Sequence, residues 1–208
     1  MIFPIRQVVD FAMKKPSETD SAYKQFFGSL PFSELKPEWE ELFLEWLIFD
    51  FKRSIGPSFL IEYVLRNPDN LNKKTLDQFE QIAKTQFYSQ FEIVEIQKGQ
   101  WIRLEDLFTG YIYKVYEKKG SEVLADRGVI PGRLGKVDDK WYLVGANSVY
   151  FPLTYTERAK KHMREFKVKN FSPKDTVELL RFSEKQLPQA VSVPTKRELE
   201  EKRKSLKK

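Results

Sequence analysis

Residues 91–107, FEIVEIQKGQWIRLEDL, mark the point at which the sequence changes its period. On both sides of Lys98-Gly99 apolar and polar residues alternate, which is typical of two strands joined by a tight turn. Before residue 88 the apolar residues instead recur with the spacing of amphipathic helices. The change of period predicts an α+β protein in which helices come first and strands second.

Further runs rich in β-branched and aromatic residues follow, at 111–117 (YIYKVYE), 123–137 and 141–145 (WYLVG). Short strands separated by glycine and aspartate turns are typical of an antiparallel β-meander or a small barrel. Helical spacing returns after residue 153, before a proline-punctuated stretch and a charged end. We therefore divide the chain into a helical part (1–88), a β-meander or small barrel (89–152), C-terminal helices (153–187) and a linker with a basic tail (188–208).

The composition excludes several kinds of chemistry. Of the 208 residues 41% are hydrophobic and 14% aromatic, which is enough for a core and argues against global disorder. There is no cysteine and one histidine, His162, so disulfides, thiolate metal sites and cysteine nucleophiles are excluded. The sequence contains no P-loop and no G-x-G-x-x-G motif that opens a helix after a strand. We expect no metal site, no cofactor and no catalytic residue.

The distribution of charge and hydropathy bears on location and partners. The formal net charge is +6, and residues 195–208 carry seven Lys/Arg and three Glu, so most of the surplus lies in the tail. No apolar run approaches the roughly 18 residues of a membrane span, so no membrane partner is expected. The first residues lack a basic leader and carry Asp10 among apolar neighbours, unlike a signal peptide. The default expectation is a cytoplasmic protein.

An aspartate interrupts the most apolar helix of the chain, at about 37–53. One stripe of this helix and most of the opposite side are apolar, which leaves Glu38, Glu41 and Glu45 for water. Asp50 falls on the apolar stripe, and a buried carboxylate requires a partner. Arg53 is in reach one turn later, and the backbone amides of the break at 54–58 are an alternative. A structural role for Asp50 and Arg53 is favoured over a general base or metal ligand.

Asp106 stands in LEDLFTG, a sequence typical of a turn that leaves a strand. A carboxylate at this position bonds the backbone amides of Thr109 and Gly110 and fixes the bend. A metal site would need several more oxygen ligands at suitable spacing. The structural interpretation is again favoured, and a metal-dependent hydrolase or nuclease that uses Asp50 and Asp106 is kept as the alternative.

The segments FLEWLIFDFKRSIGPSFLIEYVL and WIRLEDLFTGYIYKVYE, taken together, resemble a known pattern. Residues 39–145 are similar to uncharacterised bacterial proteins that often carry a SEC-C zinc motif. The resemblance implies a bacterial protein with a helical part followed by a β part, and it implies no activity. The SEC-C cysteines are absent here, so that zinc site is not carried over, and Glu105 stands where those proteins have a basic residue.

Basic residues interleaved with aromatic ones give the main functional signal. A small barrel with exposed aromatic residues beside a basic helix is how OB-type modules stack bases and follow phosphates. About half of the strand aromatics are expected in the core, because one face of each strand must be buried. The residues predicted to contact nucleic acid are Trp101, Arg103, Lys114 and Trp141 in the barrel and Arg158, Lys160, Lys161, Arg164, Lys167 and Lys169 in the helix at 157–169.

The sequence thus favours a non-enzymatic interaction module whose partner is nucleic acid or an acidic protein. The hydrolase is one alternative, and a protein–protein adaptor with an exposed apolar patch is another. The two leading hypotheses differ in what Asp50→Asn does, because a binding module loses stability and an enzyme loses turnover. The oligomeric state and the identity of the ligand stay open at this point.

Overall fold

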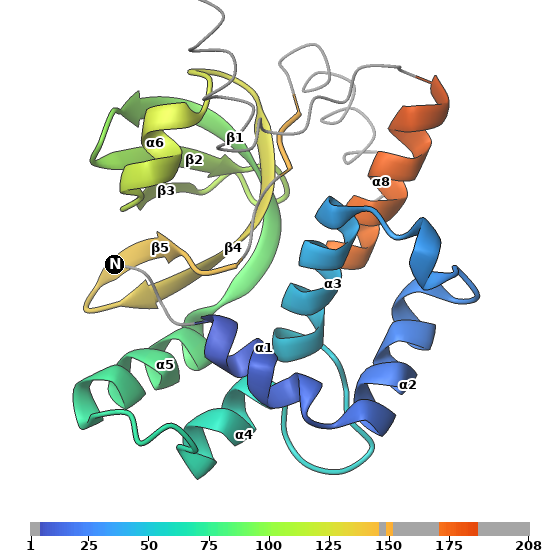
Figure 1. Ribbon diagram of the computed structural model, residues 1–208. Coiled ribbons are helices and arrows are strands. Elements are labelled where there is room, and N and C mark those ends of the chain that lie inside the picture. The colour runs from blue at the N-terminus through green and yellow to red at the C-terminus, as the bar shows by residue number, and fades with distance from the viewer. Residues whose placement is uncertain (1–4, 146–148, 152–170, 187–208) are drawn as a thin grey trace, which may run out of the picture.

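The computed structural model describes residues 5–145, 149–151 and 171–186, and it is an α+β protein. Figure 1 shows a group of N-terminal helices packed against a small β-barrel, with a C-terminal helix beside both. No helix of these described ranges is both long enough and apolar enough to cross a membrane.

The helical part consists of α1 (Ile5–Met13), α2 (Pro16–Phe27), a 3-10 turn (Phe32–Glu34), α3 (Pro37–Phe49), α4 (Phe59–Arg66) and α5 (Lys73–Thr85). Local chemistry sets the ends of these helices. Pro16 and Pro37 occupy first turns, where the missing amide costs nothing. The side chains of Ser58 and Asn72 accept hydrogen bonds from the amides of Ile61 and Thr75 at the starts of α4 and α5. α3 ends one turn earlier than expected, at Phe49, and Asp50 is its C-terminal cap.

Five strands follow: β1 (Phe87–Gln97), β2 (Trp101–Asp106), β3 (Ile112–Val115), β4 (Val129–Val137) and β5 (Lys140–Leu143). They form a closed barrel in the order β1-β2-β3-β5-β4. The sheet is mixed, because β3 and β5 run parallel while the other pairs are antiparallel. The structure is therefore a small barrel and not a meander. A short helix, α6 (Lys118–Val123), connects β3 to β4.

Alternation along the strands fills the barrel with side chains from every strand. Its interior holds a cluster of buried apolar residues: Phe91, Ile93, Ile102, Leu104, Val115, Ile130 and Leu134. Residues between these positions face either solvent or the helices. Strands β2 and β3 turn their outer sides to solvent, whereas β4 and the first half of β1 are covered on their outer sides.

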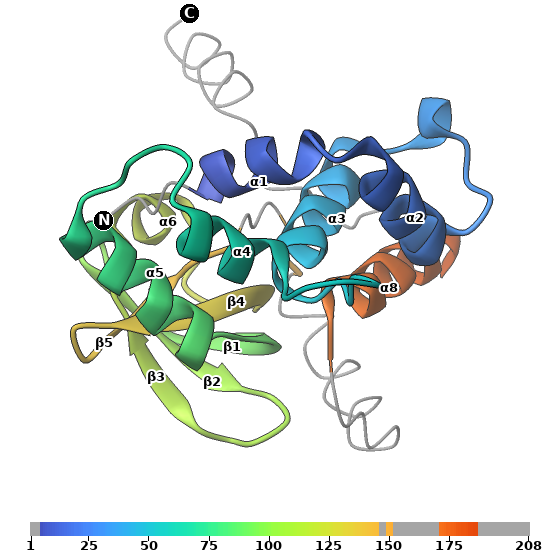
Figure 2. The same cartoon turned by 90° about the horizontal axis from the view of Figure 1, so that it is seen from below.

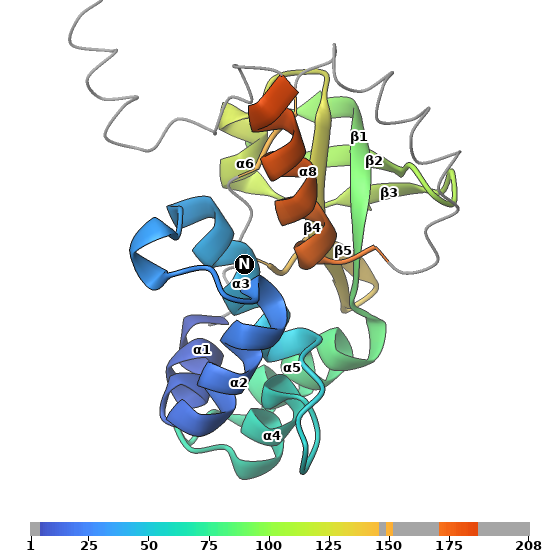
Figure 3. The same ribbon diagram turned by 90° about the vertical axis from the view of Figure 1, so that its right-hand side faces the viewer.

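A second cluster joins the helices to the barrel. Leu47 and Ile48 of α3 and Phe79 of α5 belong to the same buried cluster as Val137 of β4 and Val144 after β5. Helix α5 lies against β4, and α1, α2 and α4 surround α3 (Figure 2). The last described helix, α8 (Pro173–Gln186), contacts both α3 and β4 (Figure 3). The helical part and the barrel therefore share one core.

Candidate nucleic-acid interface

The outer face of β2 and β3 carries three of the barrel residues expected to contact nucleic acid. Ile102 pairs with Val115 and both are fully buried, so their neighbours in sequence point the other way. Arg103 pairs with Lys114 across the two strands, and both are exposed. Trp101 stands on the same face, two positions before Arg103, and is partly exposed. Alternation along the strands thus brings these three side chains together.

Cations and aromatic rings alternate across this face. The Nζ atom of Lys114 lies 4.5 Å from the centre of the Trp101 ring and 5.7 Å from that of Tyr116. Lys140 of β5 continues the series, with its Nζ atom 5.3 Å from the Tyr116 ring. We call Trp101, Lys114, Tyr116 and Lys140 the ring–cation row. At these distances the ammonium groups are attracted to the ring faces, and the rings in turn hold the lysines extended over the strands.

An acidic residue borders the row. Glu95 of β1 lies opposite Arg103, and its Oε2 atom accepts a hydrogen bond of 3.2 Å from Nη1 of that arginine. Both side chains are about half exposed, at 51% and 52%. Arg103, at the edge of the row, is therefore bound to a carboxylate. Lys114 and Lys140 are the cations of the row itself.

Trp141 does not lie on this face. Its ring makes edge contacts with Phe87 and Tyr113, with centres 5.9 and 5.1 Å apart, as part of the barrel interior. Trp141 therefore does not belong to the ring–cation row, and its contact with nucleic acid stays a prediction. β5 begins at Lys140, and alternation from that exposed lysine turns the next side chain inward. The six basic residues expected at 158–169 lie outside the described residues.

Asp50 forms an ion pair, as a buried position required, but its partner is not Arg53. It binds Arg133 of β4, whose Nη1 atom donates to Oδ1 at 3.1 Å and whose Nη2 atom donates to Oδ2. The Nε atom of Arg133 donates to Oε1 of Glu45 at 2.9 Å, and Nη1 also donates to the side-chain oxygen of Gln86. The guanidinium carbon lies 4.4 Å from the centre of the Phe49 ring. This buried cluster fastens the end of α3 to the barrel.

Glu45 was assigned to the solvent stripe of its helix, and the structure corrects this. Its side chain and that of Arg133 are each only 1% exposed. Burial raises the pKa of Glu45 to about 7, although the charge and hydrogen bond of Arg133 act in the opposite direction. The side of α3 that carries Glu45 is therefore also buried, and Arg133 of β4 supplies the positive charge that balances the carboxylate there. One signal for this pairing was in the sequence: Arg133 is the only charge between Gly128 and Gly135.

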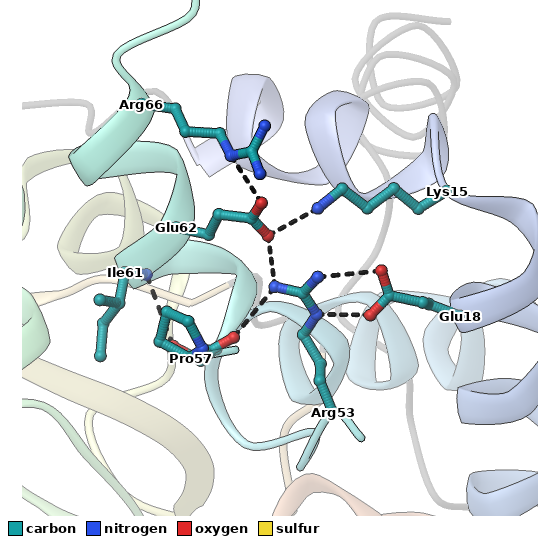
Figure 4. Close-up of polar contacts among 8 residues, drawn as sticks. Lys15, Glu18, Arg53, Pro57, Ile61, Glu62 and Arg66 are labelled. Carbon is teal, nitrogen blue, oxygen red and sulfur yellow. Dashed lines mark hydrogen bonds and ion pairs between the residues drawn. The ribbon is translucent and has the colours of Figure 1, made fainter. Parts of the chain in front are cut away.

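Arg53 organises a separate ion-pair network among the helices (Figure 4). Its Nε and Nη2 atoms donate to the two carboxylate oxygens of Glu18, at 2.5 and 2.9 Å. Its Nη1 atom donates to Oε2 of Glu62 and to the carbonyl oxygen of Pro57. Lys15 and Arg66 also bind Glu62, at 2.6 and 2.7 Å. The network joins α2, α4 and the loop between α3 and α4.

Both carboxylates of this network are held in their charged form. The hydrogen bond from Arg53 lowers the pKa of Glu18. Burial alone would raise the pKa of Glu62, but hydrogen bonds from Lys15 and Arg53 lower it. These residues have their charges satisfied by one another, so the network stabilises the fold and offers no free group for catalysis.

Asp106 fixes the turn after β2, largely as expected. Its buried carboxylate accepts hydrogen bonds from the amides of Phe108 and Thr109, at 2.8 and 3.3 Å, and from the Ser89 hydroxyl at 3.0 Å. The amide of Gly110 donates instead to the main-chain carbonyl of Asp106. Within the described ranges, no group of three or more His, Cys, Asp or Glu side chains is arranged to hold a metal ion. The hydrolase alternative therefore gains no support from these residues.

Comparisons with family models, with curated proteins and with solved structures find no match to this chain. The resemblance of residues 39–145 to SEC-C-associated proteins stays a prediction. The functional argument consequently depends on the geometry of the barrel face.

Proposed function

We propose that this protein is a non-enzymatic module that binds single-stranded nucleic acid along the outer face of β2, β3 and β5. The observation that supports this most directly is the ring–cation row, in which Trp101 and Tyr116 alternate with Lys114 and Lys140. Rings that stack on bases, next to cations that follow the phosphates, are the two components of single-strand recognition.

The topology of the barrel supports the same proposal by analogy. A closed five-stranded barrel in the order β1-β2-β3-β5-β4, with a helix between β3 and β4, has the arrangement of OB-type barrels. Barrels of this kind bind oligonucleotides and oligosaccharides on the face of their second and third strands. A shared architecture does not by itself establish a shared function, so the analogy adds to the chemistry of the row and does not replace it.

The geometry favours single strands over duplexes. The aromatic rings of the row lie on a strand surface, and they reach only bases whose faces are not already stacked in a duplex. Two further exposed side chains are Tyr111, just before β3, and Ile112, its first residue, with exposed fractions of 68% and 55%. They extend the available contact surface past Arg103, toward the turn after β2.

An acidic protein partner would contact the same lysines but would have no need of the rings. This difference separates the two partner classes that the sequence left open. Loss of an aromatic side chain should weaken nucleic-acid binding by the stacking energy of about 1–3 kcal/mol per base. Loss of a lysine should instead change the dependence of affinity on salt.

The test is fluorescence anisotropy of the full chain with labelled single-stranded RNA, single-stranded DNA and duplex, over a series of salt concentrations. Trp101→Ala should weaken single-strand binding by about fivefold or more with an unchanged salt slope. Lys114→Gln should lower the slope by about 0.7. Lys84→Gln is the matched control, because this lysine lies on α5 and is 75% exposed.

Two results would contradict the proposal. The first is an absence of binding at low salt. The second is an affinity that is the same for Trp101→Ala, Lys114→Gln and the Lys84→Gln control, because the barrel face would then not contribute to binding. Equal affinity for duplex and single strands would indicate attraction by charge alone.

A further inference from the structure

A cavity of about 670 Å³ lies where α1 and α3 meet the end of β5 and the start of α6. Its volume is in the range of small-molecule sites, roughly 300–1,000 Å³. One face of α1, one residue of α3, the last residue of β5 and the residue after it give the cavity an apolar lining: Ile5, Val9, Met13, Leu44, Leu143 and Val144. It shares no residue with the ring–cation row, so it is a second site, independent of the proposed function.

The polar part of the lining is strongly acidic. Two cations line the cavity, Arg6 and Lys119, and Arg6 is paired with Asp10 at 3.4 Å. Against these two stand five carboxylates, from α1, from α3 and from the residue that caps α6: Asp10, Glu40, Glu41, Glu45 and Glu117. The excess of negative charge disfavours an anionic ligand and favours a cationic one.

One of these carboxylates has an unused oxygen. Oε1 of Glu45 is bound by Nε of Arg133, and the remaining nitrogens of that arginine donate to Asp50 and Gln86. Oε2 of Glu45 is buried and has no hydrogen-bond partner, although the side chain is only 1% exposed. A buried carboxylate oxygen without a donor costs free energy, so a ligand that donates to it gains affinity.

A glycine that lines the cavity packs against that oxygen. Gly145 follows β5, and a Cβ atom at this position would clash with the carboxylate of Glu45. Any side chain there would push the carboxylate away from its place. Gly145 and Glu45 both line the cavity, so the unpartnered oxygen lies just behind its inner wall, closed to solvent, and a ligand reaches it when the Glu45 side chain rotates toward the cavity. Glu40 and Glu41 are nearer the surface of the same helix.

The requirements for a ligand follow from this arrangement. It must carry more than one positive charge, it must donate hydrogen bonds, and it must have an alkyl body for the apolar lining. An ammonium group supplies three donors and no acceptor, and methylene segments between such groups suit the apolar residues. A metal ion does not match this site, because it makes no use of the apolar lining and because the described residues contain no group of three side chains placed to ligate it.

We propose that this cavity binds an aliphatic polyamine, with one ammonium group directed to Glu45 and the others to the carboxylates of the rim. Binding requires Glu45 in its charged form. The groups around it are Arg133 of β4, Asp50 at the end of α3 and Tyr88 of β1. Burial raises the pKa of Tyr88 well above its ordinary value, whereas it raises the pKa of Glu45 to about 7, so Glu45 is the group that changes its charge near neutral pH.

The test is isothermal titration calorimetry of the full chain with spermidine, and with 1,8-octanediol as an uncharged ligand of similar length. Spermidine should bind saturably, and affinity should increase between about pH 6 and about pH 8 as Glu45 loses its proton. The diol should not bind. The double variant Glu40→Gln, Glu41→Gln should weaken binding by roughly two- to fivefold per carboxylate, because these side chains are close to solvent.

Glu45→Gln should weaken binding by more than about tenfold and remove its pH dependence, because the amide carries no charge. The rim variants keep the test valid if this buried variant does not fold. Glu38→Gln, on the same helix but outside the cavity, is the matched control and should bind as the unchanged protein does. The proposal is overturned if spermidine does not bind, or if Glu38→Gln weakens binding as much as the rim variants do.

Discussion

Arg133 of β4 and Asp50 at the end of α3 form an ion pair between residues 83 positions apart in the chain. The arginine is buried and also binds Glu45, while Asp50 keeps 29% of its side chain exposed. The pair joins the barrel to the helical part at a point where apolar contacts surround it. The contribution of the pair to stability depends on all three charged residues, Arg133, Asp50 and Glu45, being present, because a buried charge that loses its partner is costly.

Replacing Arg133 alone should be strongly destabilising. Arg133→Met leaves the carboxylates of Glu45 and Asp50 without their countercharge, at an expected cost of about 3–5 kcal/mol in the free energy of unfolding. Adding Glu45→Gln and Asp50→Asn to the same chain should recover part of this loss, because no unpaired charge then remains. Urea denaturation of the single and triple variants measures the difference.

The control for this prediction is Arg103→Met, which removes an arginine that is half exposed and paired with one glutamate. It should change the free energy of unfolding by less than about 1 kcal/mol. A triple variant that is less stable than Arg133→Met would show that the cluster stabilises the junction through its hydrogen bonds and not through charge compensation.

The pKa of Glu45 also predicts how stability depends on pH. In the folded protein burial raises the pKa of Glu45 to about 7, from its ordinary value of 4.5. The folded state therefore keeps a proton that the unfolded state releases, and the contribution of Glu45 to stability decreases as pH rises from about 4.5 to about 7. Glu45→Gln should flatten the dependence of the melting temperature on pH in that window.

The ion-pair network around Arg53 makes stability depend on pH in the opposite direction. The pKa values of Glu18 and Glu62 are lowered, so their contribution to stability is present near neutral pH and is lost as pH falls below their ordinary value of 4.5. The two effects fall in separate pH ranges, which allows one melting series to resolve both. If Glu45→Gln left the slope between about pH 5 and about pH 7 unchanged, Glu45 would not be the group that titrates there.

The burial of Asp50 was predictable from the sequence, whereas its partner was not. An aspartate at the next position of an apolar helical stripe must be buried, and that inference used only local spacing. The choice between Arg53 and Arg133 depends on which strand packs against α3, and local spacing contains no information about that. Glu45 was misplaced for the same reason, because a polar stripe on a helix indicates solvent only when no charged strand residue covers it.

The barrel was partly predictable in the same way. Period-two alternation predicted that about half of the strand aromatics face the core, and in the structure Trp101 faces outward while Trp141 packs toward the barrel interior. The face that Trp141 takes was not predictable, because its direction depends on the residue at which a four-residue strand begins. The parallel pairing of β3 with β5, which closes the barrel, joins residues separated by α6 and β4 and leaves no mark on the local pattern.

Arg53 should not tolerate lysine. Its guanidinium donates to both oxygens of Glu18, to Glu62 and to the Pro57 carbonyl, whereas a lysine has one ammonium group and cannot span these partners. We expect Arg53→Lys to lower the free energy of unfolding by about 1–3 kcal/mol, measured by urea denaturation. Arg66→Lys is the matched control, because Arg66 is 66% exposed and binds Glu62 alone; it should cost less than about 1 kcal/mol. Equal effects of the two changes would show that charge, and not the shape of the guanidinium, matters in this network.

Glu95 should limit the affinity of the barrel face for nucleic acid. Its carboxylate binds Arg103 at 3.2 Å, which occupies that cation and places a negative charge beside the proposed path of the phosphates. Glu95→Gln should therefore strengthen single-strand binding by roughly two- to fivefold at low salt and increase the salt slope by up to about 0.7, as Arg103 becomes available to a phosphate. Glu80→Gln on α5 makes the same change in net charge at a side chain of similar exposure, 53%, and should leave both quantities nearly unchanged. Anisotropy titrations of the two variants decide the matter, since an equal gain in both would mean that net charge, and not the position of Arg103, sets the affinity.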